Sequence, residues 1–341
     1  MAAINVSKSS RTHVTQRPRP RLAWVRYGYP ISPRQLRAAA GKFRVAILQP
    51  WEVAAAQHLK EANPHTVVLA YKCLSSVRTY EPGPVYSSGI SPHDAAELNT
   101  CATDEQWAGY AEHVQQKVWE KKYQDAWVRA VVGEIAAGPF DGVMADNDVF
   151  GDYYGHGLDM GMVRSGLDTL VHTAGAKLNE QGKLLVPNIA ESRCEPDRWL
   201  RHSRFGGGFE ECWLGWGNAG DGWLDVECCL DQMEQMDCDG LIIARVPAKP
   251  WSRRRYVEFA LAAAWVFFPT RDIAVTATAH DDYSCLPMYA DLDLGLPVGG
   301  IKREGNVFYR EFTHGQAAVN LGATRQKGLM RRSGQLRLTR L

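Results

Sequence analysis

Between about residues 22 and 276, short apolar runs alternate with longer stretches in which apolar residues recur every three or four positions. Short runs rich in β-branched and aromatic residues are typical of buried strands, and the longer stretches are typical of helices. Strands are predicted at residues 22–27, 45–48, 66–71, 142–146, 184–188, 207–212, 241–245 and 273–276. Helices are predicted near residues 52–62, 104–137, 159–181, 195–204, 225–237 and 252–265.

The prediction of the longest helix, near residues 104–137, depends on a capping pair and on the spacing of apolar residues. Thr103 can cap its first turn, with Gln106 three residues on as the second half of a capping box. The apolar residues that recur at roughly helical spacing are Trp107, Tyr110, Val114, Val118 and Tyr123.

Strands that alternate with helices in this way predict an α/β protein built as a single (β/α)8 TIM barrel. The competing fold is an open, doubly wound sheet. No G-x-G-x-x-G motif follows an early strand, and the glycine run at residues 206–208 lacks that spacing. A dinucleotide-binding sheet is therefore disfavoured.

The chain is predicted to divide into four parts. Residues 1–20 are expected to be a basic arm and residues 21–283 the barrel that carries catalysis. Residues 284–324 are expected to form a β-hairpin appendage packed on the barrel, with its turn near Gly315. Residues 325–341 are expected to be a basic tail.

Charge is distributed unevenly along the 341 residues, although the net charge is only +1. Residues 1–44 hold ten Lys and Arg, and residues 325–341 hold six, with no acidic residue in either segment. The middle of the chain therefore has 23 basic residues against all 38 acidic ones, a net charge of −15. Nucleic acid is disfavoured as the substrate, because a phosphate backbone needs a positive groove. The basic ends could instead dock onto a larger assembly, or be solvated tails.

The eight cysteines include no C-x-x-C pair and are expected to be reduced thiols. A zinc site from Cys228, Cys229 and Cys238 is the weaker alternative, and no cofactor or metal is expected. Residues 1–20 lack the apolar segment of a signal peptide, which suggests a protein that is cytoplasmic when made. The longest apolar run, residues 259–268, is too short to span a membrane.

Barrel enzymes place their chemistry at the carboxyl ends of the strands, so polar residues that end apolar runs are the candidates. Asp146 ends one such run, and alternation places Asp148 on the same side. A carboxylate at that position costs stability unless it is hydrogen-bonded or functional. The alternative is that Asp146 only caps the following loop.

A second acidic position follows the strand predicted at residues 207–212, where Glu210 and Glu211 are adjacent and must point in opposite directions. Trp213 and Trp216 come next. Exposed indole rings near carboxylates bind sugar rings, although core packing is the commoner role of a tryptophan. An Asp and a Glu from separate strand ends form the pair that glycoside hydrolysis requires.

Further polar residues follow the predicted strands and are candidates for substrate binding. These are Tyr27, Gln49, Trp51, Tyr71, Lys72, Asn188 and Arg245, together with Asp148, Glu210, Trp213 and Trp216. Lys72 has two interpretations. A buried ammonium needs a carboxylate neighbour, and the alternative is the Schiff-base lysine of a lyase or aldolase.

Several motifs in this order resemble glycoside hydrolase-like family 15, a TIM-barrel family similar to the endo-α-1,4-polygalactosaminidases. The resemblance covers roughly residues 22–322. The motifs are Arg26-Tyr27-Gly28, Ala70-Tyr71-Lys72, Phe140-Asp141-Gly142-Val143 with Asp146, Val186-Pro187-Asn188, Glu210-Glu211 and Tyr309-Arg310-Glu311-Phe312.

The resemblance implies a glycoside hydrolase that acts on a polysaccharide or cell-surface glycan, with Asp146 and Glu211 as catalytic pair and Glu210 as the alternative to Glu211. It leaves open which carboxylate is the acid and whether the anomeric configuration is retained. It also suggests a virion protein, because such domains occur among tail proteins of phages that infect actinobacteria. The alternative function is a catalytically inactive carbohydrate-binding or structural virion protein with the same barrel.

Overall fold

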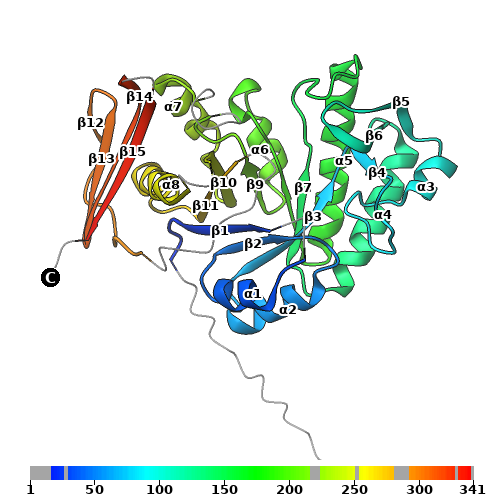
Figure 1. Cartoon of the computed structure of the whole chain (residues 1–341), viewed down its shortest axis with the longest axis horizontal. Coiled ribbons are helices and arrows are strands. Elements are labelled where there is room, and N and C mark those ends of the chain that lie inside the picture. The colour runs from blue at the N-terminus through cyan, green and yellow to red at the C-terminus, as the bar shows by residue number, and fades with distance from the viewer. Residues whose placement is uncertain are drawn as a thin grey trace, which may run out of the picture.

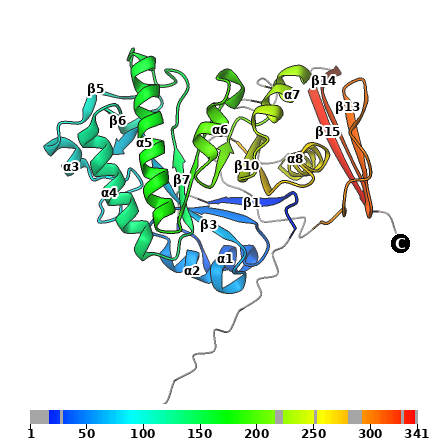
Figure 2. The ribbon, with the colours of Figure 1, turned by 180° about the vertical axis from the view of Figure 1, so that it is seen from behind.

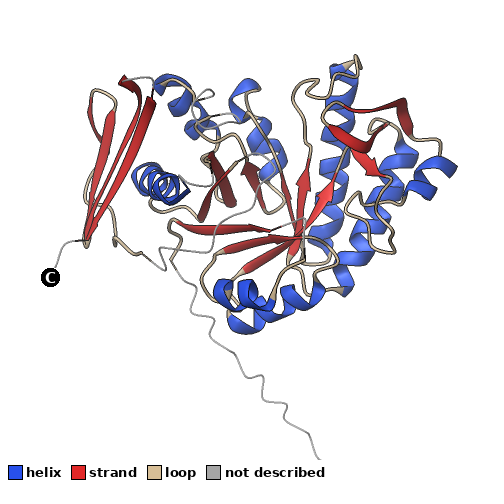
Figure 3. Cartoon of the chain, viewed as in Figure 1, coloured by secondary structure: helices blue, strands red, loops and turns tan. Residues whose placement is uncertain are grey.

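The computed structural model describes residues 17–26, 30–215, 223–249, 253–279, 292–326 and 329–338. Its centre is a barrel of parallel strands surrounded by helices (Figures 1 and 3). The strands are β1 (Arg21–Arg26), β2 (Val45–Leu48), β3 (Val67–Cys73), β7 (Gly142–Asp146), β8 (Leu184–Pro187), β9 (Gly207–Glu210), β10 (Leu241–Pro247) and β11 (Ile273–Thr278). All eight predicted strands are present.

The sheet order is β8-β7-β3-β2-β1-β11-β10-β9, and each neighbouring pair is parallel. Two bridges, Leu185 to Gly206 and Asn188 to Phe209, join β8 to β9 and close the ring. The predicted (β/α)8 TIM barrel is therefore confirmed.

A helix connects each pair of consecutive barrel strands. The helices are α1 (Pro33–Ala39), α2 (Val53–Ala62), α4 (Lys121–Ala137), α5 (Met160–Glu180), α6 (Arg198–Ser203), α7 (Val226–Gln235) and α8 (Arg253–Phe267), with a 3-10 turn η1 (Ser192–Cys194) before α6. Helix α1 was not predicted, although Ser32 and Gln35 form a capping box and Pro33 occupies its first turn.

The prediction of a helix near residues 104–137 is wrong for the first half of that range. There the chain forms β4 (Ser76–Arg78), α3 (Pro92–Glu97), β5 (Cys101–Trp107) and β6 (Tyr110–Gln116), and the three strands make an antiparallel sheet. Gly109 has φ +82° between β5 and β6, a conformation that suits a tight turn. The expected capping residue Gln106 instead accepts a hydrogen bond from the backbone N–H of Glu112 at 2.9 Å. We refer to residues 74–119 as the β3–α4 insertion.

Strand alternation determines which side chains face the barrel interior. Val25, Ile47, Met144, Phe209 and Ile243 belong to the inner cluster, whereas their chain neighbours pack outward against the helices. Because alternation continues to the strand ends, residues two positions further along also face inward.

An antiparallel sheet follows the barrel, with order β12 (Lys302–Glu304), β13 (Val307–Phe312), β14 (Gly315–Gln326) and β15 (Leu329–Leu338). The predicted hairpin with its turn near Gly315 is β13–β14. Residues 329–338, expected to belong to a basic tail, instead pair with β14 as a fourth strand. The sheet covers α8 at the opposite end of the molecule from the insertion (Figures 1 and 2).

The first described residues contact the segment that leads into this sheet. Arg17 pairs with Asp293 at 2.7 Å, and Arg19 donates to the carbonyl of Leu292 at 2.7 Å. Within the described ranges, no helix is long and apolar enough to cross a membrane. The seven described cysteines form no disulfide with one another.

Candidate active site

Asp146 ends β7 and, two residues after the inward-facing Met144, lies at the carboxyl-terminal mouth of the barrel. The hydroxyl of Tyr71 donates to one carboxylate oxygen, as does Nδ2 of Asn147 at 3.1 Å. Nδ2 of Asn188 donates to the other oxygen at 2.8 Å. An ionised carboxylate only accepts hydrogen bonds, so this ring of three donors suits a charged Asp146.

Tyr71 is itself held in place by Arg78 of the insertion. Nη2 of Arg78 donates to the Tyr71 hydroxyl at 2.6 Å, and the guanidinium carbon lies 4.9 Å from the ring centroid. Burial, which the charge of Arg78 opposes in part, raises the pKa of Tyr71 well above 10. The phenol therefore keeps its proton and can donate it to the hydrogen bond with Asp146.

The two adjacent glutamates occupy different environments. Glu210 is fully buried on the outward side of β9, and its carboxylate accepts the backbone N–H groups of Glu191 at 3.0 Å, Ser192 at 2.8 Å and Cys212 at 3.0 Å. Burial raises the pKa of Glu210, and these hydrogen bonds oppose the shift. Glu210 thus joins β9 to the loop after β8, while Glu211 lines a pocket.

The pocket has a volume of about 120 Å³ at the barrel mouth. Its lining residues are Tyr110, Asn147, Asp148, Val149, Tyr153, Tyr154, Asn188, Ala190 and Glu211. Asn147 and Asn188 are also two of the donors to Asp146, so the surroundings of Asp146 and the side chain of Glu211 border one cavity. Strand β8 lies between β7 and β9, and the two carboxylates thus come from strands two positions apart, as their spacing along the chain allows.

One wall of the pocket is aromatic and was not predicted. Tyr154 stacks on Trp107 of the insertion, with centroids 3.7 Å apart and planes 4° from parallel, and Tyr110 meets Tyr154 edge-on at 5.8 Å. The Tyr154 hydroxyl donates to Oδ1 of Asn147. Burial, followed by the charges of Asp146 and Glu211, raises the pKa of Tyr154, so this phenol lies within electrostatic reach of both carboxylates.

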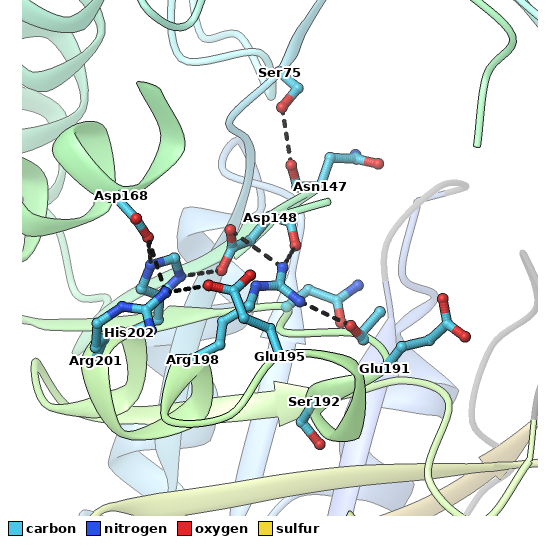
Figure 4. A network of polar contacts seen from close by, with 12 residues as sticks. Ser75, Asn147, Asp148, Asp168, Glu191, Ser192, Glu195, Arg198, Arg201 and His202 are labelled. Atoms are coloured by element: carbon cyan, nitrogen blue, oxygen red, sulfur yellow. Dashed lines mark hydrogen bonds and ion pairs between the residues drawn. The ribbon is translucent and has the colours of Figure 1, made fainter. Parts of the chain in front are cut away.

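Asp148 was predicted to bind substrate, but its carboxylate pairs with His202 and Arg198. It is 1% exposed and lies 2.5 Å from Nδ1 of His202 and 3.4 Å from Arg198 (Figure 4). On its other side, Nε2 of His202 lies 2.5 Å from Asp168. Burial alone would lower the pKa of His202, but these carboxylates raise it to about 9. The Asp148 carboxylate therefore stabilises this network, and a substrate-binding role for Asp148, which also lines the pocket, stays a prediction.

Lys72 does not reach the pocket. It lies between the inward-facing Tyr71 and Cys73, and is fully buried on the outer side of β3. Its ammonium is 2.7 Å from Glu134 of α4 and 2.6 Å from the carbonyl of Tyr86. The carboxylate neighbour expected for a buried lysine is present, and nothing in the described structure places the ammonium at the pocket, as the Schiff-base and substrate-binding interpretations require.

The remaining predicted binding residues differ in exposure. Trp213 is fully buried and offers no ring face to a sugar. Trp51 follows β2 and is 43% exposed, while Gln49 and Arg245 are buried on the inward faces of their strands. Tyr27 and Trp216 lie outside the described residues.

A closed (β/α)8 barrel with acidic side chains at its carboxyl-terminal mouth defines the class of TIM-barrel enzymes. Within that class, the chain belongs to the family described as hypothetical glycosyl hydrolase family 15, whose model matches residues 60–316. The resemblance drawn from the sequence motifs is confirmed, and the protein is classed as a glycosidase.

No curated protein sequence matches this chain. Among solved structures, Ega3 from Aspergillus fumigatus in complex with galactosamine is 8% identical, with a TM-score of 0.47 over 78% of this chain and 94% of that one. The maltogenic α-amylase AmyB from Thermotoga neapolitana is 10% identical, with a TM-score of 0.46 over 87% and 85%. A class V chitinase from Nicotiana tobaccum is 9% identical, with a TM-score of 0.39 over 68% and 67%. The family assignment therefore rests on the match over residues 60–316.

Proposed function

We propose that the protein hydrolyses glycosidic bonds in a polysaccharide or cell-surface glycan, with Asp146 and Glu211 as the catalytic carboxylates. One observation carries the proposal. Glu211 lines the same cavity as Asn147 and Asn188, and both of these donate hydrogen bonds to Asp146.

The surroundings of Asp146 suggest how the two roles divide. Three hydrogen-bond donors favour its charged form, which is the form required of a nucleophile or a general base. Glu211 is then the general acid. It protonates the glycosidic oxygen as the bond to the anomeric carbon breaks, and Asp146 either attacks that carbon or activates a water molecule.

The stereochemical outcome depends on the distance between the two carboxyl groups. Backbones two strands apart are separated by about 10 Å, and side chains that converge towards the barrel axis shorten that distance. A separation of about 5–5.5 Å gives retention, and about 6.5–9.5 Å gives inversion. Proton NMR of the first anomer released distinguishes the two cases.

The proposal is tested with a panel of neutral, amino and acidic glycans. We expect Asp146→Asn and Glu211→Gln each to lower kcat by about 10²–10⁴-fold, since each removes a proton carrier or a nucleophile. Glu304→Gln, an exposed residue on the C-terminal sheet, is the matched control and should keep wild-type activity. Activity that survives both substitutions at the pocket would overturn the assigned pair.

The alternative of a catalytically inactive carbohydrate-binding protein predicted a groove lined by Trp213 and Trp216. Trp213 is buried in the core, which removes half of that groove. The association with a phage tail stays a prediction, and mass spectrometry of purified virions is the measurement that tests it.

A further inference from the structure

Arg245 is a buried cation that forms no ion pair with any carboxylate of the described residues. It is 5% exposed, and its Nη1 donates to the carbonyl of Thr278 at 3.0 Å. Its Nη2 has no hydrogen-bond partner, and in the part of the chain that the structure describes the guanidinium forms no ion pair. A buried charge of this kind is costly unless something neutralises it.

The position of Arg245 on β10 places it at the barrel mouth beside Glu211. Ile243 belongs to the inner cluster, so alternation directs Arg245 inward as well. Ala244 pairs with Glu210 of β9. Arg245 is therefore level with Glu211 on the neighbouring strand, at the height where the proposed chemistry takes place.

Two other side chains at the mouth carry buried polar atoms that lack partners. Oδ1 of Asn188, which is 3% exposed, and Oε1 of Gln49, which is 8% exposed, accept no hydrogen bond in the described structure. Both residues are two positions beyond members of the inner cluster, Val186 and Ile47, and so face inward. The mouth thus offers amide oxygens that complement sugar hydroxyls and a guanidinium that complements a carboxylate.

We propose that the glycan carries a uronic acid, and that Arg245 binds its carboxylate at the barrel mouth. This inference rests on the proposed glycosidase function and names its substrate class. A neutral sugar would satisfy the amide oxygens but leave the guanidinium charge unpaired. A dense polyanion such as nucleic acid is disfavoured, because the chain between residues 45 and 324 has 23 basic and 38 acidic residues and is therefore negatively charged.

Binding is measured first, with sugars that differ only at C6. D-Glucuronate and D-galacturonate should raise the Tm of the wild-type protein, or give saturation-transfer NMR signals, at concentrations about tenfold below those needed for D-glucose and D-galactose. Equal responses to the acidic and neutral sugars, or no response to either uronate, would overturn the proposal without any variant being made.

Substitution at Arg245 then tests the residue itself. Arg245→Gln should lower the preference for uronates by about 10- to 100-fold, and Arg245→Lys, which keeps the charge, should lose less. Lys302→Gln, an exposed cation on β12, is the matched control and should leave the preference unchanged. A preference that persists in Arg245→Gln would refute the assignment.

Cleavage assays separate this inference from the function on which it rests. Polygalacturonate and glucuronan are compared with the same polymers after chemical reduction of their carboxylates. Hydrolysis of only the reduced polymers, abolished by Glu211→Gln, would support the glycosidase and refute the uronate. Binding of uronates that depends on Arg245, with no polymer cleaved, would support the uronate site and refute the hydrolase.

Discussion

Asn147 shows how much the candidate site depends on one residue. It has φ +63°, in the left-handed region that asparagine tolerates better than most residues. In this conformation it donates to Asp146, accepts from Tyr154, and receives on its carbonyl a hydrogen bond from Ser75 at 2.9 Å. Asn147 therefore links Ser75 of the insertion to Asp146, the proposed nucleophile or base.

Removal of the Tyr154 hydroxyl tests this chain of contacts. We expect Tyr154→Phe to lower kcat by about tenfold with a smaller change in KM, because Asn147 loses its partner while the ring stack on Trp107 remains. Tyr80→Phe, whose hydroxyl lies 3.4 Å from His113, serves as the control. Identical kinetics for both variants would contradict a positioning role.

His202 gives the stability a defined pH dependence. Its pKa is about 9 in the folded protein, above the ordinary 6.5, so the folded state binds the proton more tightly. The stabilisation, about 3 kcal/mol, is therefore complete below pH 6.5 and is lost as pH rises through 9. Urea unfolding between pH 6 and pH 9.5 should show this decline, and His202→Gln should flatten it. A decline of the same size in the variant would assign it to other groups.

At the scale of elements, strand alternation accounts for most of the site. Helical spacing, by contrast, gave a wrong prediction for the first half of the helix near residues 104–137. Alternation along β3 directs Tyr71 into the barrel and Lys72 outward. After β9 it directs Glu211 into the barrel and Glu210 outward. The apolar positions 107, 110 and 114 also fit two strands joined by a tight turn. The end of the insertion, at Val118 and Trp119, then packs on α5 through a close approach at Gly166.

Two helical glycines make a matched pair for testing that approach. A Cβ on Gly166 would lie 2.6 Å from the backbone of Trp119, so Gly166→Ala should destabilise the protein by about 1–3 kcal/mol. A Cβ on Gly133 of α4 meets nothing within 4 Å, so Gly133→Ala should stabilise it by about 0.5–1 kcal/mol. Chemical denaturation measures both, and a stabilising Gly166→Ala would show that the two segments can move apart.

At the scale of the whole molecule, the C-terminal sheet is part of the barrel's covering. The ring of Phe312 meets that of Trp265 of α8 edge-on, with the ring centroids 5.2 Å apart. The ring centroids of Phe308 and Phe267 are 5.4 Å apart. Both contacts bury aromatic rings between the sheet and α8, so the sheet and the barrel share one hydrophobic core.

A substitution at that contact should destabilise the barrel as well as the sheet. We expect Phe312→Ala to lower the free energy of unfolding by about 3–5 kcal/mol, because the ring is 6% exposed. Val307→Ala on the same strand, where the side chain is 36% exposed, should cost less than about 1 kcal/mol. Separate transitions for sheet and barrel in calorimetry would show that they unfold independently.

The sequence by itself determined the eight strands, the barrel and the two acidic positions at strand ends, because periodicity and alternation are properties of neighbouring residues. Only the tertiary structure decided which distant side chains the polar residues near the strand ends contact. Asp148 meets His202, 54 residues away, and Lys72 meets Glu134, 62 residues away. Trp107 reaches Tyr154 only through folding of the insertion. Such contacts depend on how distant segments pack, and no local pattern records them.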